Sequence, residues 1–465
     1  MTYAFTFDAA FCSGCKACQA ACKDKNDLPL GVLWRRVVEV SGGTWQKNGA
    51  AWNNSVFAYN VSIACNHCLH PKCAGVCPTG AYLVREDGIV LLDTEKCMGC
   101  GYCAWACPYG APQYNVNTGT MTKCNFCFDH LDQGLPPVCV AACPLRVLDY
   151  EETMTGLAVK ELRLWEVPAE QHPYPLPGDS HTQPRLAIKP HAAMNAPEEK
   201  FVANLEEIQP RIPSQWEDVP LILFTLLTQM AVGGFWAMLW TFPRLWTLVE
   251  QETTLLQGLP LLLIGGCLGA GMLASLAHLG RKKRAWRALG NLRKSWLSRE
   301  VLFTGLFGTG WLLTTLQSIF WHRNTVEWMA LTATLGFGLV YSMSRVYRLH
   351  TVPGWNTRRT NLVFIVSALL LGQSLMATLL PYGSQGIGGT ILVLLFLQLS
   401  LMHKWLPRYP FHPIRVGLIL AAMILSIISL SLPGSWLSAL IFLIVAMEES
   451  IGRWSFYQAA HGSFL

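Results

Sequence analysis

The beginning of the sequence lacks the features of a secretory signal peptide. Residues 1–20 have neither a basic start nor a continuous apolar run, although the chain contains seventeen cysteines. A disulfide-rich scaffold would need a secreted chain and an oxidising compartment. We therefore expect that the cysteines stay reduced and bind metal, and that the part of the protein that contains them is made in the cytoplasm.

Histidine is missing from the middle of every long apolar segment in the second half of the chain. The histidines after residue 219 stand at segment ends or in loops, at His278, His322, His350, His403, His412 and His461. Because haem b needs two imidazoles that face each other inside helices, we expect no haem. Acidic and basic residues are also scarce within these segments, which disfavours a ferredoxin-fused transporter or ion pump, the alternative from another functional class.

The charge of the chain is unevenly distributed and divides the sequence into three parts. Residues 1–150 carry 11 Lys/Arg and 11 Asp/Glu, residues 151–218 carry 6 and 12, and residues 219–465 carry 18 and 6. The basic excess thus lies in the apolar part, which indicates orientation in a lipid bilayer and not nucleic-acid binding. We expect a four-cluster domain at 1–150, a Pro-rich connector at 151–218 that packs on that domain or on a partner, and a transmembrane anchor at 219–465.

Sixteen of the seventeen cysteines form four groups of four within the first part. Three closely spaced cysteines can ligate one iron–sulfur cubane, while in two-cluster bacterial ferredoxins the fourth ligates the other cluster. Zinc sites use two separated C-x2-C pairs, so the additional cysteines disfavour zinc. The spacing predicts four [4Fe–4S] clusters with all sixteen cysteines as iron ligands. The groups are Cys12, Cys15, Cys18 and Cys22; Cys65, Cys68, Cys73 and Cys77; Cys97, Cys100, Cys103 and Cys107; and Cys124, Cys127, Cys139 and Cys143.

Between the cysteine groups the sequence favours short strands. Residues 34–63 are rich in Val, Thr, Trp and Tyr and contain turn signals, which predicts strands or a hairpin. Residues 83–93 predict a short hairpin around Asp87-Gly88.

The third part predicts about eight membrane-spanning helices. Most of its apolar segments are long enough to cross a bilayer, at residues 219–241, 256–279, 301–321, 328–347, 361–381, 387–403, 414–432 and 435–451. Fifteen basic residues lie in the second, fourth and sixth loops, and only Arg244 and Arg323 lie in the odd loops. The positive-inside rule then places the cluster domain on the cytoplasmic face of the cytoplasmic (inner) membrane. The expected fold is an α+β ferredoxin-like domain fused to an all-α eight-helix bundle.

Without haem, the lipid-soluble redox partner that remains is a quinone. His278 ends the second apolar segment and Glu300 opens the third, so both are candidates for quinol binding and proton transfer. An interfacial histidine and an acid favoured by the helix dipole are the simpler alternatives. Glu449 and Arg453 are four residues apart and predict an ion pair, with proton delivery by Glu448 and Glu449 as the alternative. Cys267 is expected to be a packing residue.

The sequence resembles the dimethyl sulfoxide reductase family over nearly its whole length. Residues 1–200 are similar to the iron–sulfur electron-transfer subunit, in the four cysteine groups, the Cys22-Lys23-Asp24 step and residues 184–190. Residues 216–465 are similar to the membrane anchor subunit, which in the family is usually a separate polypeptide. The matching pieces are residues 216–221, Gly233-Gly234-Phe235, residues 274–280, Arg345-Val346-Tyr347 with Thr351-Val352-Pro353, and Ile451-Gly452-Arg453.

The resemblance implies ligand sets that exchange cysteines between the first and fourth groups and between the second and third. The sets are Cys12, Cys15, Cys18 and Cys143; Cys22, Cys124, Cys127 and Cys139; Cys65, Cys68, Cys73 and Cys107; and Cys77, Cys97, Cys100 and Cys103. Some relatives have Trp at the position of Cys100 and carry a [3Fe–4S] cluster, whereas this chain keeps the cysteine.

The resemblance also implies the role of the chain. His278 and Glu300 would bind menaquinol, and electrons would pass through the clusters to a molybdopterin catalytic subunit during anaerobic respiration. The chain alone would not reduce the terminal acceptor, because it has no pterin-binding fold. Alternatively, the chain could have the same role in a polysulfide, thiosulfate or other oxyanion reductase, or in a quinone-reducing dehydrogenase. The sequence does not distinguish these enzymes, because the substrate is recognised by the catalytic subunit, which is a different chain.

Overall fold

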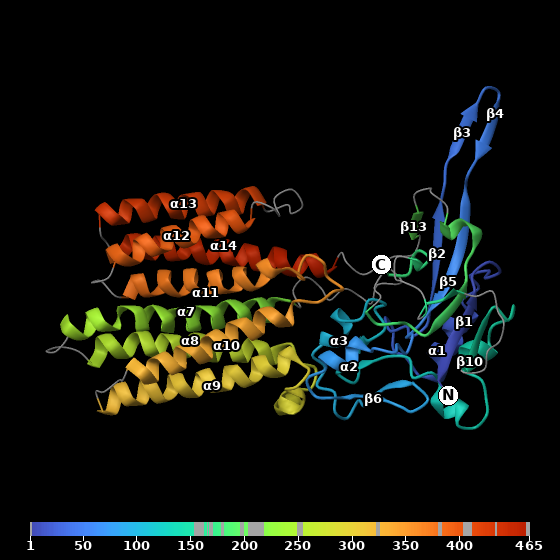
Figure 1. Ribbon diagram of the computed structural model, residues 1–465, viewed down its shortest axis with the longest axis horizontal. Coiled ribbons are helices and arrows are strands. Elements are labelled where there is room, and N and C mark those ends of the chain that lie inside the picture. Colours follow the sequence, from blue (N-terminus) through green and yellow to red (C-terminus); the bar gives the residue numbers. More distant parts are fainter. Residues whose placement is uncertain are drawn as a thin grey trace. The chain divides into compact units, whose positions relative to one another are not determined.

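A computed structural model of the chain describes two compact units (Figure 1). One consists of Met1–Ile212, Leu279–Lys294 and Ser463–Leu465, and the other of Pro213–His278 and Ser295–Gly462. The three-part division at 150 and 218 stays a prediction, and much of the expected connector lies outside the described residues. The described residues are 2–152, 162–164, 166, 171–177, 181–195, 200–202, 218–248, 254–321, 326–379, 384–402, 412–432 and 435–461.

The first unit is built from short strands and short helices, as expected for a domain that wraps several clusters. A four-stranded sheet has the order β10-β1-β12-β11, and a three-stranded sheet has the order β13-β2-β5. Three two-stranded hairpins, β3-β4, β6-β7 and β8-β9, complete the strands. The strands are β1 (Tyr3–Asp8), β2 (Arg36–Gly42), β3 (Trp45–Asn48), β4 (Ala51–Asn54), β5 (Phe57–Ile63), β6 (Tyr82–Val84), β7 (Val90–Leu92), β8 (Gln113–Asn115), β9 (Thr120–Thr122), β10 (Leu148–Glu152), β11 (Leu162–Arg163), β12 (Leu186–Lys189) and β13 (Lys200–Val202).

Both strand predictions are confirmed. Residues 34–63 contain β2 and β5, which pair antiparallel over their full length, and the β3-β4 hairpin between them. The β6-β7 hairpin turns at Asp87-Gly88, where Gly88 has a φ of +80° that a side chain would disfavour. Three described segments from within 151–218 are also strands of this unit, because β11 pairs with β12, β12 pairs with β1 and β13 pairs with β2.

The core of the first unit lies between its sheets and the cysteine loops. Phe5 on β1 stacks on Phe126, with ring centroids 4.1 Å apart, and both rings are buried. Five helices of one to three turns carry or follow cysteines and are too short to be stable alone. They are α1 (Ala17–Lys25), α2 (Lys72–Val76), α3 (Tyr102–Trp105), α4 (Phe128–Leu131) and α5 (Val138–Ala141).

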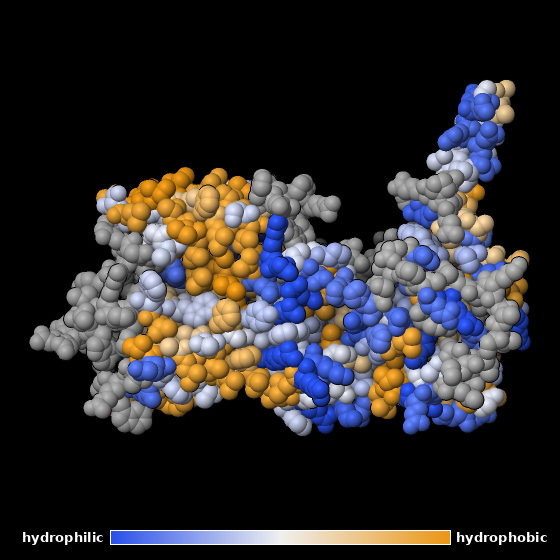
Figure 2. All heavy atoms as spheres, viewed as in Figure 1, coloured by the Kyte–Doolittle hydropathy of each residue, from blue (hydrophilic) through white to orange (hydrophobic). Residues whose placement is uncertain are grey.

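The described residues of the second unit are mainly helical, with a loop at 347–357. Four of its helices are long and apolar enough to cross a membrane, over Val219–Trp240, Gly258–Ala277, Arg358–Leu379 and His412–Ser431, while the expected count of eight spans stays a prediction. Figure 2 shows hydrophobic side chains gathered on the visible face of these helices, as lipid contact requires. The helices are α7 (Val219–Leu248), α8 (Thr254–Ala277), α9 (Trp296–Leu316), α10 (Val326–Val346), α11 (Arg358–Leu379), α12 (Ser384–Met402), α13 (His412–Ser431) and α14 (Ser435–His461), with a π-helical turn at Gln317–Trp321.

Helices α7 and α11 pack backbone against backbone at a pair of glycines. A Cβ atom added to Gly372 would overlap the backbone of Gly233, and one added to Gly233 would overlap the carbonyl of Ala368. Small residues allow such close approach between helices in a membrane, where packing replaces the hydrophobic effect as the force that joins them.

Replacing Gly372 with alanine should destabilise this packing. We expect Gly372→Ala to lower the free energy of unfolding of the helical unit by about 1–3 kcal/mol, because the new methyl group forces the two backbones apart. Thermal unfolding of the full chain in detergent measures the change. Gly266→Ala is the matched control, since a Cβ there meets no atom within 4 Å; equal effects of both variants would contradict the packing argument.

Candidate functional site

The first C-x2-C turn of each cysteine group shares one backbone feature. The residue before the second cysteine has a positive φ in each turn: +69° at Gly14, +41° at His67, +73° at Gly99 and +62° at Phe126. This conformation turns backbone amides toward sulfur, so Gly99 N donates to Cys97 Sγ and Phe126 N donates to Cys124 Sγ, each at 3.4 Å. Amide donors aimed at sulfur stabilise the negative charge of thiolates and of the clusters they ligate.

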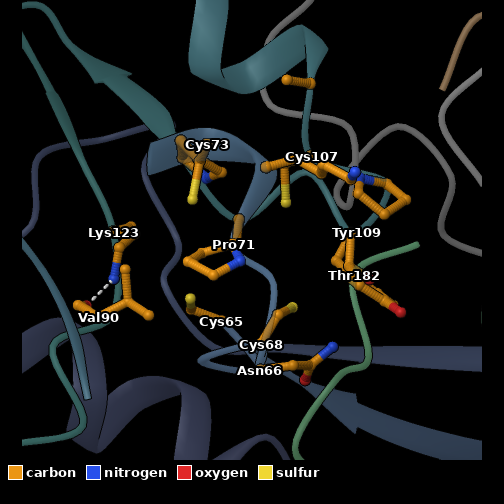
Figure 3. A pocket seen from close by; sticks show the side chains of 15 residues that line it. Cys65, Asn66, Cys68, Pro71, Cys73, Val90, Cys107, Tyr109, Lys123 and Thr182 are labelled. Atoms are coloured by element: carbon orange, nitrogen blue, oxygen red, sulfur yellow. Dashed lines mark hydrogen bonds between the residues drawn. The ribbon is translucent and has the colours of Figure 1, made fainter. Parts of the chain in front are cut away.

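One cysteine set surrounds a hollow in the first unit. Cys65, Cys68 and Cys73 from the second group and Cys107 from the third line a space of about 390 Å³, which includes its open mouth. Figure 3 shows their four sulfur atoms pointing into this space. A neighbouring lysine, Lys123, donates hydrogen bonds to the carbonyls of Cys124 and Val90. Three thiols from one segment and a fourth from a distant one thus meet at one place.

A second hollow joins the first and fourth groups. Cys12, Cys15, Cys18 and Cys143 line a space of about 340 Å³, and Cys18 Sγ lies 3.4 Å from the Ser62 hydroxyl. Both hollows contain the sets of four that the family resemblance implies.

The remaining cysteines are also grouped across the sequence. Cys22 lies close enough to Cys124, Cys127 and Cys139 for the charges of their thiolates to interact. Cys77 has the same relation to Cys97, Cys100 and Cys103. In each of the four sets, the structure therefore places the thiols near one another.

Each of the two hollows brings four cysteine thiols together, which is the number of ligands that a [4Fe–4S] cluster takes. No close group of three His, Cys, Asp or Glu side chains is found in the described part of the sequence. Burial raises the pKa of the Cys22 thiol to about 12. Thiols that are this hard to ionise alone become thiolates only when a metal replaces the proton, so cluster binding and folding are coupled.

Three buried cations among the cysteines were not predicted from the sequence. Arg35 is only 2% exposed, donates to the Ser62 hydroxyl at 3.1 Å and stacks on Phe5. Burial alone would lower the pKa of Arg35, but the surrounding cysteine charges raise it overall. Arg36 and Lys123 are equally buried and bond to backbone carbonyls. Their charges oppose the negative charge of ligated clusters, and the only sequence signal was a pair of arginines within a strand.

The basic segment Leu279–Lys294 belongs to the first unit and hydrogen-bonds to the backbone of two cysteines that are predicted to be cluster ligands. It contains a run of 3₁₀ turns over Lys282–Asn291. Arg284 donates to the carbonyl of Cys97 at 3.1 Å, and the Asn291 amide donates to that of Cys77 at 2.9 Å. Further bonds join Arg281 to Met98 and Thr118, and Arg284 and Arg287 to Glu95. The basic residues of this segment, which the sequence analysis attributed to membrane orientation, thus also make specific contacts.

The predicted quinol residues both lie in the second unit and both have unsatisfied polar atoms. Glu300 is 3% exposed in the second turn of α9, and its Oε1 has no hydrogen-bond partner among the described residues. His278 follows the end of α8, and its buried Nδ1 likewise lacks a partner there. Glu300 lies within charge-interaction range of Tyr347 and Tyr457, whose hydroxyls are hydrogen-bonded to each other. No hydrogen bond joins His278 to Glu300 within the described residues.

The predicted Glu449–Arg453 pair makes no direct ion-pair contact in the described residues, because groups on neighbouring helices hydrogen-bond both side chains, although the two charges are close enough to interact. Glu449 accepts hydrogen bonds from Ser367 at 2.7 Å and from Gln398 at 3.1 Å. Arg453 donates to Gln229 at 2.7 Å. The ion pair in the described residues of this region joins Arg415 to Glu448 at 2.6 Å.

Comparison with known proteins identifies the family. Residues 212–406 match the model of the DMSO reductase anchor subunit (DmsC), and residues 56–153 match the 4Fe-4S dicluster domain. A component of the anaerobic dimethyl sulfoxide reductase of Escherichia coli (strain K12) is 48% identical over 190 residues, which are 41% of this chain and 89% of that relative. The chain belongs to the dimethyl sulfoxide reductase family. It joins the iron–sulfur electron-transfer part and the membrane anchor of such an oxidoreductase in one polypeptide.

The iron–sulfur part also has relatives in other enzymes. The formate dehydrogenase iron-sulfur subunit of Wolinella succinogenes is 40% identical over 166 residues, covering 31% of this chain and 78% of the relative. A tetrathionate reductase subunit of Salmonella typhimurium is 40% identical over 141 residues, covering 30% and 54%. The resemblance inferred from the motifs is confirmed, and the first part is shared more widely than the family.

Serine substitutions should reveal which cysteines share a cluster. We expect Cys22→Ser and Cys124→Ser to remove the same EPR signal, although they lie about 100 residues apart, because both thiols would ligate one cluster. Each variant should lose up to about a quarter of the iron. Cys267→Ser, which changes a cysteine in α8, should keep all the iron. If Cys22→Ser matched Cys12→Ser instead, the exchange of ligands between groups would be refuted.

Removing Arg284 should change the redox potential of one cluster selectively. We expect Arg284→Ala to shift the cluster of Cys77, Cys97, Cys100 and Cys103 to a more negative potential, because a positive charge and a hydrogen bond to a ligand carbonyl are lost. A redox titration monitored by EPR measures the shift. Lys283→Ala is the control, because Lys283 is exposed. A uniform shift of all clusters, or none, would show that the contact has no local effect.

Proposed function

We propose that this chain oxidises menaquinol and transfers the electrons through four [4Fe–4S] clusters to a molybdopterin catalytic subunit. The main support is that four cross-sequence sets of four thiols and a buried, unsatisfied carboxyl group at Glu300 occur in one polypeptide. Bound clusters supply one-electron transfer. The ligand sets are those given above, from Cys12 to Cys143.

The residues around the cysteines of the first unit would stabilise the negative charge of bound clusters. Amides in the C-x2-C turns donate to sulfur, and Arg35, Arg36 and Lys123 place positive charge beside the thiols. Both features favour the reduced, more negative form of a cluster and so raise its potential. Burial excludes water, which strengthens these interactions.

His278 and Glu300 would bind the quinol and take its protons. Oxidation of menaquinol to menaquinone releases two electrons and two protons. The Glu300 carboxylate can accept a hydrogen bond from one ring hydroxyl and then its proton, and His278 Nδ1 can do the same for the other. Unsatisfied buried polar atoms support this role, because a ligand would supply the missing partners.

The anchor would cross the cytoplasmic membrane eight times, with the cluster domain on the cytoplasmic face. The distribution of basic residues over the loops supports this orientation. The terminal acceptor would be reduced by the catalytic subunit.

The similarity to a formate dehydrogenase subunit supports a second candidate, in which a dehydrogenase sends electrons through the clusters to quinone. The match to the DMSO reductase anchor favours the reductase.

Neutralising Glu300 tests the quinol site. We expect Glu300→Gln to slow oxidation of a menaquinol analogue about 100-fold or more, because the amide cannot accept the proton. The rate is read from cluster reduction in the full chain, followed by absorbance. Glu327→Gln, at an exposed acid in the first turn of α10, should be neutral. An unchanged rate in Glu300→Gln, with full iron content, would move the site elsewhere.

A further inference from the structure

A cavity lies entirely within the helical unit, among α11, α12, α13 and α14. Its volume is about 860 Å³ including its open mouth. Neither His278 nor Glu300 lines it. Whatever it binds is therefore additional to the quinol site proposed above.

Buried polar atoms around this cavity lack partners. Gln398 and Arg453 line it and are 1% and 3% exposed, and Gln398 Oε1 and Arg453 Nε have no hydrogen-bond partner among the described residues. His412 also lines it, and its buried Nε2 is likewise unpartnered there. One unpartnered atom accepts hydrogen bonds and another donates them. Native structures rarely leave such atoms unsatisfied, so a ligand that both donates and accepts is indicated.

The charges at the cavity are largely balanced. Arg415 is paired with Glu448 at 2.6 Å, and the Glu449 carboxylate stands opposite the positive charge of Arg453. Arg359 has no acidic partner among the described residues that line the cavity. A phosphate group beside Arg453 would also face the Glu449 carboxylate, whose like charge opposes it. A neutral ligand fits this set better than an anionic lipid head group.

The remaining lining is aromatic and apolar. Phe364 and Phe456 contribute rings whose centroids are 5.8 Å apart, and the Arg453 guanidinium lies 3.9 Å from the Phe364 ring centroid. Val363 and Leu401 add aliphatic surface. A flat aromatic ring can pack against such side chains, and an apolar tail can leave along the aliphatic ones.

We propose that this cavity is a second binding site for a quinone or quinol head group. Gln398 Oε1 and the Glu449 carboxylate would accept hydrogen bonds from ring hydroxyls, and Arg453 Nε and His412 Nε2 would donate to ring carbonyls. The chain would then hold two quinone-type molecules, one in this cavity and one at Glu300. The cavity site does not depend on the role proposed for His278 and Glu300.

The stoichiometry of quinone binding tests this proposal. The full chain, in nanodiscs of neutral phosphatidylcholine, is titrated with a short-tailed radiolabelled menaquinone. We expect two equivalents per native chain. Leu401→Trp and Val363→Trp, which fill the cavity from two facing helices, should each weaken one equivalent at least tenfold. Val393→Trp, at a position on α12 that is 67% exposed, should retain both equivalents and the native rate of quinol oxidation.

The outcomes separate this site from the first one. One equivalent in the native chain, lost in Glu300→Gln, would overturn the second site without the help of any cavity variant. Two equivalents in both folded filling variants, with native iron content and thermal unfolding, would also overturn it. So would mass spectrometry showing a phospholipid retained by the native chain and lost in Leu401→Trp at constant quinone content. If Glu300→Gln left quinol oxidation intact while Leu401→Trp lost one equivalent, the first site would fail and this one would stand.

Discussion

The meeting of cysteines from distant parts of the sequence is the constraint that organises the first unit. Cys12, Cys15 and Cys18 share a hollow with Cys143, so residues about 130 positions apart must meet at one place. The antiparallel pairing of β1 with β10 holds these two segments together just beside their cysteines. Because the thiols are buried and hard to ionise alone, the iron that binds them also stabilises the fold. The buried cations Arg35 and Lys123 are tolerable for the same reason, since ligated clusters carry the opposing charge.

The helical unit solves a different problem, which is how to place polar groups within an apolar bundle. Glycines at α7 and α11 bring two backbones into contact, and buried hydroxyls bond back to carbonyls of their own helix, as Thr304 does to Glu300. Where polar side chains cross between helices they are paired, as Arg453 is with Gln229. The buried atoms that remain unsatisfied include those of Glu300 and His278 and three at the cavity of Gln398. These are the places where a ligand would complete the structure.

Much of this could be predicted from the sequence, because cysteine spacing and hairpin signals are local. The strands in 34–63 and the turn at Asp87-Gly88 follow from residue types within a few positions. The Glu449–Arg453 pair failed because spacing along one helix says nothing about Ser367 and Gln229 on others. Arg35 and Arg36 were missed because burial of a cation depends on distant thiols. The contacts of the basic segment around Arg284 were also not predicted, because the positive-inside rule already accounted for basic residues in this loop.

The central claim is that quinol oxidation and the cluster chain are joined in this one polypeptide. The most direct measurement is anaerobic mixing of the purified, iron-replete full chain with a menaquinol analogue, in the absence of any catalytic subunit. The account predicts about 16 irons per chain, and cluster reduction by the quinol that is visible by EPR and sensitive to a quinol-site inhibitor. Fully loaded clusters that a menaquinol analogue of sufficiently low potential cannot reduce would contradict it.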